Sequence, residues 1–138
     1  MKALFVATLC ISLVFYAGEA FSQSDEILCT WVNSKYVSDN PPQKLILNYD
    51  GTFECYATKT STDAIKRGVF QIIKKWEDSE KNIWYQIKMH DPKYGTKFKL
   101  ARISNNGNIL EFVCQPNEFP AEISTTDPNY CRYMREST

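Results

Sequence analysis

Few side chains in this 138-residue sequence are of the types that carry out chemistry at enzyme sites. His90 is the only histidine, and it precedes Asp91 in a stretch whose Pro92 and Gly95 are typical of a turn. Glu77 and Asp78 are adjacent, so their carboxylates point apart and cannot share a substrate. The sequence contains no nucleophile elbow, zinc-protease motif or glycine-rich phosphate loop. We therefore expect a protein that is not an enzyme and uses no cofactor.

The N-terminus resembles a secretory signal peptide. Lys2 precedes an apolar run over residues 3–16, and Gly18, Ala20 and Ser22 provide the small residues that signal peptidase prefers. The run is shorter than the roughly 20 residues that span a membrane, so no stable membrane anchor is expected. We predict that residues 1–22 are removed, with cleavage after Ala20 or Ser22, and that the protein is secreted or periplasmic.

Cysteine is the reactive residue type that occurs several times in this sequence, with five copies. Once Cys10 leaves with the signal peptide, Cys29, Cys55, Cys114 and Cys131 remain. An even count in a small exported chain favours two disulfides, whereas metal binding is not expected because no C-x-x-C spacing occurs. We prefer Cys29 with Cys131 and Cys55 with Cys114, because the first and last strands are expected to be neighbours. The sequence leaves the other two connectivities open.

The charge balance excludes several classes of partner. Sixteen basic and sixteen acidic residues leave no net charge, so neither nucleic acid nor an anionic membrane is an expected partner. Residues 23–138 have the size of one domain with one core, and we expect a monomer.

Turn signals and alternating apolar residues predict an all-β domain. Asp50-Gly51 predicts a hairpin with a type I′ turn, and Asn106-Gly107 predicts a second hairpin. About eight short strands are expected, over residues 27–33, 44–49, 53–57, 66–76, 83–89, 96–103, 109–114 and 130–135. An eight-stranded antiparallel meander closed into a barrel removes both sheet edges, and a two-sheet β-sandwich is the alternative.

The alternation also assigns side chains to the two faces of the strands. Six aromatic residues are expected to face the interior, where they either bind a ligand or simply fill the core: Phe53, Phe70, Trp76, Tyr85, Phe98 and Phe112. Trp84 is expected on the outer face. The connection over residues 115–129 is long and contains Phe119, so Trp84 and Phe119 are the candidate surface for a protein partner.

Three short motifs resemble those of lipocalins, small proteins that include secreted members in bacteria. Cys29-Thr30-Trp31 resembles the family's G-x-W motif, with Cys29 in place of the glycine. The segment from Tyr49 to Phe53 and the sequence Gly68-Val69-Phe70 are similar to later family blocks. The other family blocks are missing from this sequence.

This resemblance implies a barrel whose closed end is plugged by Trp31. It also implies that an arginine of the last strand, Arg132 or Arg135, stacks on the indole. The function expected from it is binding of a small hydrophobic molecule in the barrel. The alternative is a module that binds a protein, such as an inhibitor of an exported enzyme or a surface interaction protein.

Overall fold

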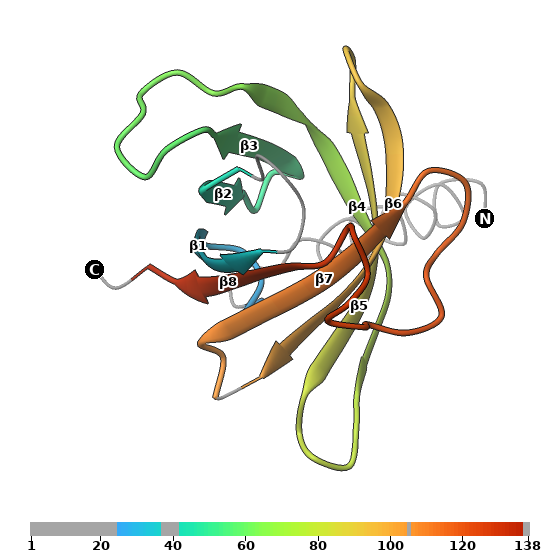
Figure 1. Ribbon diagram of the computed structural model, residues 1–138. Helices are drawn as coiled ribbons and strands as arrows, with labels where there is room; N and C mark the ends of the chain where they lie inside the picture. The colour runs from blue at the N-terminus through green and yellow to red at the C-terminus, as the bar shows by residue number, and fades with distance from the viewer. Residues whose placement is uncertain (1–24, 37–41, 105, 137–138) are drawn as a thin grey trace, which may run out of the picture.

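The chain forms a closed eight-stranded antiparallel β-barrel, as the sequence predicts. The computed structural model describes residues 25–36, 42–104 and 106–136 (Figure 1). The strands are β1 (Thr30–Tyr36), β2 (Lys44–Leu47), β3 (Thr52–Tyr56), β4 (Lys66–Glu77), β5 (Ile83–Asp91), β6 (Gly95–Ser104), β7 (Ile109–Gln115) and β8 (Cys131–Arg135). Each strand pairs with its neighbours in sequence, and β8 closes the barrel against β1.

Two of the sequence predictions concern the N-terminal part and membrane spans. The predicted signal peptide, residues 1–22, lies outside the described residues. Within the residues that are described, no helix is long and apolar enough to span a membrane.

The two predicted hairpins are both present, but one turn type differs from the prediction. In the β2–β3 hairpin Gly51 has a φ of 86°, whereas Asp50 does not share the positive φ of a type I′ turn. The amide of Gly51 donates to the carbonyl of Asn48 at 3.1 Å. The Asp50 carboxylate accepts from the amide and the hydroxyl of Thr52 at 3.0 and 2.6 Å, which stabilises this alternative turn. Asn106 and Gly107, with φ of 56° and 90°, do form the predicted pair of positive-φ residues.

A β-bulge in β4 reverses the faces on which its residues lie. Before the bulge, Ile72 pairs with Ile87, which is buried in the core. The register then shifts between Ile72 and Lys74, and beyond the shift Trp76 pairs with Trp84. The two indole rings stack on the outside of the barrel, with centroids 5.9 Å apart and planes 8° apart. The prediction that Trp76 faces the interior is therefore wrong, because one extra residue inverts the alternation.

The outer face of β6 is covered by the connection between β7 and β8, residues 116–130. Phe98 meets Phe119 of this connection edge to face, with ring centroids 5.1 Å apart. Leu100 and its partner Val113 are 4% and 0% exposed, although neither belongs to the barrel core. The predicted inward position of Phe98 is thus wrong, because the burial of Phe98 and Leu100 comes from the connection and not from the barrel interior.

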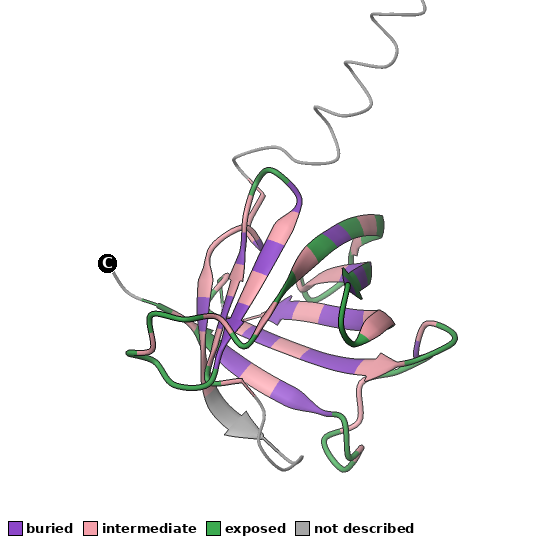
Figure 2. Ribbon diagram, turned by 90° about the horizontal axis from the view of Figure 1, so that it is seen from above, coloured by how far each residue is buried: buried purple, intermediate pink, exposed green. Residues whose placement is uncertain are grey.

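The barrel core is continuous and gathers residues from all eight strands and from the segment before β1. Figure 2 shows buried and partly exposed bands alternating along the strands. The predicted interior positions of Phe53, Phe70, Tyr85 and Phe112 are confirmed, since all four belong to the core. The other core residues are Ile27, Trp31, Leu45, Leu47, Cys55, Ile87, Met89, Ala101, Ile103, Leu110, Cys131 and Tyr133.

Candidate functional site

One end of the barrel is plugged by Trp31. The indole is fully buried, and its nitrogen donates to the carbonyl of Ile27 at 3.0 Å. The guanidinium carbon of Arg135 lies 5.0 Å from the centre of the ring. Arg132, the other candidate for this position, is at an outward position on β8 opposite Glu111, because odd and even residues of a strand face opposite sides.

The segment before β1 closes this end further. The hydroxyl of Tyr85 donates to the Asp25 carboxylate at 2.6 Å, and Lys75 Nζ lies 3.4 Å from the other oxygen of that carboxylate. Burial, followed by the contact with Asp25, raises the pKa of Tyr85. Arg135 donates to the carbonyl of Glu26 at 2.8 Å. These contacts hold the segment before β1 against the Trp31 end of the barrel.

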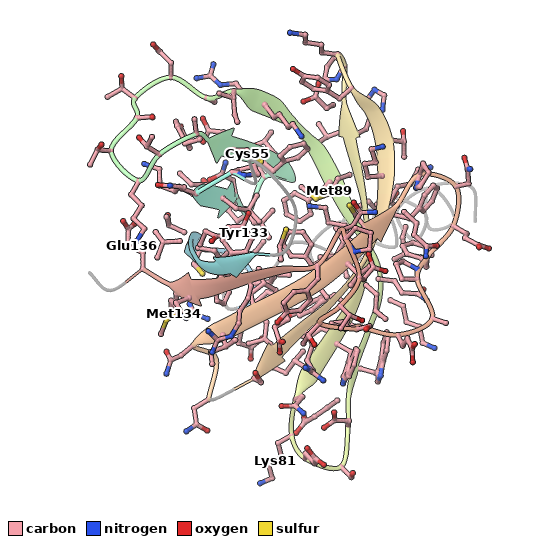
Figure 3. All side chains as sticks on the ribbon, in the orientation of Figure 1. Cys55, Lys81, Met89, Tyr133, Met134 and Glu136 are labelled. Atoms are coloured by element: carbon pink, nitrogen blue, oxygen red, sulfur yellow. The ribbon has the colours of Figure 1, made fainter. Side chains whose placement is uncertain are left out.

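The opposite end of the barrel contains a cavity of about 320 Å³. Between this cavity and the Trp31 end the barrel interior is filled by side chains, because the void among the core residues there measures only about 10 Å³. The walls include Leu45, Phe53, Met89 and Phe112, which continue the core toward the open end. Figure 3 shows Cys55, Met89 and Tyr133 facing the enclosed space, while Met134 points away from it. The barrel is therefore half filled and half open.

Two aromatic side chains form a rigid part of the cavity wall. Phe112 and Tyr133 are stacked, with ring centroids 5.5 Å apart and planes 10° apart. The hydroxyl of Tyr133 donates to the carbonyl of Pro42 at 2.9 Å, which ties β8 to the start of β2. Since both rings are held by contacts within the chain, this part of the wall is preformed.

Three lysines line the cavity: Lys66, Lys97 and Lys99. On β6 the inward positions are Lys97, Lys99 and Ala101, because Ala101 belongs to the core and alternate residues share a face. Lys99 is flanked by Ile87 on β5 and Cys114 on β7. Its Nζ lies 4.0 Å from the centre of the Phe112 ring.

Among the described residues, Asp91 is the only carboxylate that lines the cavity, and this residue is 7% exposed. One oxygen accepts hydrogen bonds from the amides of Lys93 and Tyr94 at 2.7 and 3.2 Å, which holds the turn between β5 and β6. The other oxygen has no hydrogen-bond partner among the described residues. His90, the neighbour of Asp91, is exposed and contacts Thr96 Oγ1 at 2.9 Å. The two side chains lie on opposite faces of β5, so they do not form a catalytic pair.

None of the four cysteines of residues 25–136 forms a disulfide, so the predicted disulfides are wrong. Cys29 precedes β1, whereas Cys131 pairs with Tyr36 near the far end of that strand. At about 3.3 Å per residue the two are roughly 20 Å apart, well beyond the reach of a disulfide. Cys55 on β3 and Cys114 on β7 are four strands apart in an eight-stranded barrel and therefore lie on opposite walls.

Three of these thiols, those of Cys55, Cys114 and Cys131, line the cavity. Burial raises the pKa of Cys55, an effect that nearby Lys99 and Lys66 partly offset. Burial also raises the pKa of Cys29, at the closed end, to about 11. In the ranges that the structure describes, no three His, Cys, Asp or Glu side chains form a group that could hold a metal ion.

The structure distributes the six predicted ligand-contacting aromatics over three environments. Phe53 and Phe112 line the cavity. Phe70 and Tyr85 belong to the core but do not line the cavity, and Trp76 and Phe98 lie outside the barrel. The polar and aromatic lining residues that sequence reasoning missed include Lys66, Lys97, Lys99, Asp91 and Tyr133.

A signal for the missed lysines was present in the Asn106-Gly107 hairpin. With Leu110 and Phe112 facing inward on β7, the register of this hairpin requires their partners Ile103 and Ala101 to face inward as well. The same alternation then brings Lys99 and Lys97 to the interior. Because Phe98 and Leu100 are hydrophobic, their face of the strand was expected to be the inner one, in disagreement with this register.

The candidate partner surface, Trp84 and Phe119, is engaged in contacts within the chain. The indole nitrogen of Trp84 donates to Asp78 at 2.8 Å, and the guanidinium carbon of Arg102 lies 5.2 Å from the ring centre. The hydrogen bond from Trp84 is the largest cause that brings the pKa of Asp78 down to about 2. Phe119 is half-buried against Phe98. Both aromatic side chains therefore have a structural role in the folded chain.

The chain was compared with protein-family models, curated proteins and solved structures. No family model, curated protein or solved structure matches this chain.

Proposed function

We propose that this protein is an exported, lipocalin-like binding protein that holds a small hydrophobic molecule in the open half of its barrel. The observation that carries the proposal is the cavity of about 320 Å³, whose walls continue the apolar core above a plugged end. Ligand sites in proteins are concave, mostly apolar and largely preformed, and their volumes are about 300–1,000 Å³. The cavity lies at the lower end of this range, which favours a small ligand.

Two further features support the proposal. The stacked pair of Phe112 and Tyr133 presents fixed apolar surface to the cavity, so binding requires little ordering of side chains. Export rests on the N-terminal sequence, in which an apolar run follows Lys2 and ends at small residues.

A cavity-filling variant tests whether the ligand binds inside the barrel. Cys114 lines the cavity, so Cys114→Phe introduces a large ring there. Lys88 is exposed on β5, so Lys88→Phe adds the same ring on the outer surface and serves as the matched control. The probe is N-phenylnaphthylamine, an uncharged dye that fluoresces in apolar surroundings, and circular dichroism confirms that each variant is folded.

The proposal requires saturable enhancement of the dye's fluorescence in the wild type and in Lys88→Phe, with strong weakening in Cys114→Phe. Saturable binding that is unchanged in folded Cys114→Phe would place the dye outside the cavity and contradict the proposal. No saturable binding by the wild type would contradict it as well.

A further inference from the structure

We infer that the molecule held in the barrel carries an anionic group, which Lys99 binds inside the cavity with Lys97 and Lys66 nearby. This inference rests on the proposed function and specifies the class of ligand. A carboxylate, sulfate or phosphate group on an apolar tail has the required chemistry.

The position of Lys99 is the first support. Its inward direction is fixed by the register, since its neighbours across the sheet, Ile87 on β5 and Cys114 on β7, also face the interior. An ammonium group at this depth loses part of its hydration, and an anion is the partner that compensates for this loss best.

The second support is that no carboxylate of the described residues forms an ion pair with these lysines. Among the described residues, none of the ion pairs involves Lys66, Lys97 or Lys99. Lys99 Nζ lies 4.0 Å from the centre of the Phe112 ring, and Lys66 Nζ lies 5.1 Å from that of Tyr94. Cation–π contacts orient an ammonium group without neutralising it, so the positive charge of both side chains remains available.

The third support is the balance of charge around the cavity. Three lysines line it together with one carboxylate, that of Asp91. One oxygen of Asp91 already accepts two backbone hydrogen bonds from the turn at residues 91–95. Lys99, Lys66 and Asp91 line this cavity together with the Cys55 thiol. Summed over the described lining residues, the net charge at the cavity is positive, although the whole chain carries none.

The test compares ligands that share one apolar tail and differ only in the charge of the head group. Decanoate, decanol and decyltrimethylammonium are titrated into the protein by calorimetry, and each series is repeated with shorter and longer tails. Charge-assisted hydrogen bonds predict that decanoate binds about tenfold or more tightly than decanol, and that the cation binds most weakly.

Substitutions then identify the residue that binds the charged head group. In Lys99→Gln the ratio of the acid's affinity to the alcohol's is expected to fall toward one, and in Lys88→Gln, on the outer surface, the ratio is expected to keep its wild-type value. A variant with Lys66, Lys97 and Lys99 all changed to Gln should bind the acid no better than the alcohol.

The outcomes separate this inference from the proposed function. If the wild type binds decanoate and decanol equally well, the anionic ligand is overturned while the hydrophobic site stands. If the ratio of the acid's affinity to the alcohol's is unchanged in the folded triple variant, the lysines do not bind the charged head group and the inference is overturned. If no member of any series binds, the proposed function itself fails.

Discussion

The guanidinium group of Arg135 links four separate parts of the chain at the closed end of the barrel. Its carbon lies 5.0 Å from the centre of the Trp31 ring on β1. Its Nε donates to the carbonyl of Gly107 in the β6–β7 turn at 2.8 Å, and its Nη2 donates to the carbonyl of Glu26 at 2.8 Å. One side chain of the last strand therefore holds the first strand, the N-terminal segment and a hairpin turn together.

We expect Arg135→Gln to destabilise the protein by about 2–4 kcal/mol, because two charge-assisted hydrogen bonds and the contact with Trp31 are lost. Urea unfolding followed by tryptophan fluorescence measures the loss. Arg132→Gln is the control, since Arg132 lies at an outward position on the same strand, and it should cost clearly less. Equal losses in the two variants would show that Arg135 is not the residue that secures the plug.

Gly68 lies at a position where the surrounding atoms leave no space for a side chain. A Cβ atom at this position would lie 2.0 Å from the carbonyl oxygen of His90 and 2.8 Å from the ring of Phe53. Gly68→Ala is therefore expected to cost about 3 kcal/mol or more, because backbone as well as side chain must move. Gly95→Ala is the comparison: Gly95 has a φ of 86° with open space around it, and only conformational strain of about 1–2 kcal/mol is expected. Thermal unfolding of both variants checks this order.

Asp78 should make stability depend on pH in the acid range. Its pKa in the folded chain is about 2, below the ordinary value of 3.8, with the hydrogen bond from Trp84 as the largest cause. Because the folded value is depressed, the stabilisation is complete above pH 3.8 and is lost as the pH falls toward 2. The indole N–H resonance of Trp84, followed by NMR, should titrate with a midpoint near 2, and this step should vanish in Asp78→Asn. A midpoint near 3.8 would contradict the hydrogen bond seen here.

Cys29 should be slow to react in the folded protein. Burial raises its pKa to about 11 from 9.0, which lowers the fraction of thiolate near neutral pH about a hundredfold. Labelling with iodoacetamide, followed by mass spectrometry of the peptide that contains Cys29, should give a correspondingly slower rate in the folded than in the urea-unfolded chain. Equal rates would mean that Cys29 is more accessible than its contacts indicate.

Phe119 is expected to contribute to stability. Phe119→Ala removes its edge-to-face contact with Phe98 and should destabilise the protein by about 1–2 kcal/mol. Tyr49 is an aromatic residue that is 59% exposed, so Tyr49→Ala should change stability by less than about 0.5 kcal/mol. Chemical denaturation of both variants provides the measurement, and an unaffected Phe119→Ala would return Phe119 to the set of residues that are free to bind a partner.

Local sequence signals account for much of the fold. The number of strands, both hairpins and the inward positions of Phe53 and Phe112 follow from alternation and turn residues, and barrel closure is the preferred one of the two expected architectures. These signals are local, because a turn residue acts on its own φ and ψ angles and a strand alternates with a period of two. The expected ligand contacts at Phe53 and Phe112 do line the cavity.

The errors in assigning side chains to the inner or outer face have one physical cause, which is that alternation shows which residues share a face and not which face is inside. In β4 the bulge after Ile72 turns Trp76 outward, and nothing in the local pattern marks the extra residue. In β6 the apolar residues Phe98 and Leu100 are buried beneath a connection that returns from later in the chain.

The sequence alone therefore predicted about eight strands and favoured their closure into a barrel, with a two-sheet β-sandwich as the alternative. Only the tertiary structure decided what the barrel encloses. Covering the outer face of β6 with residues 116–130 brings Lys97 and Lys99 to the inner face, because the two faces of one strand cannot be exchanged independently. The local patterns conflict here, because the apolar residues of β6 favour one inner face and the register of the Asn106-Gly107 hairpin favours the other. Contacts between distant parts of the chain decide between them and so produce the cavity and its positive charge.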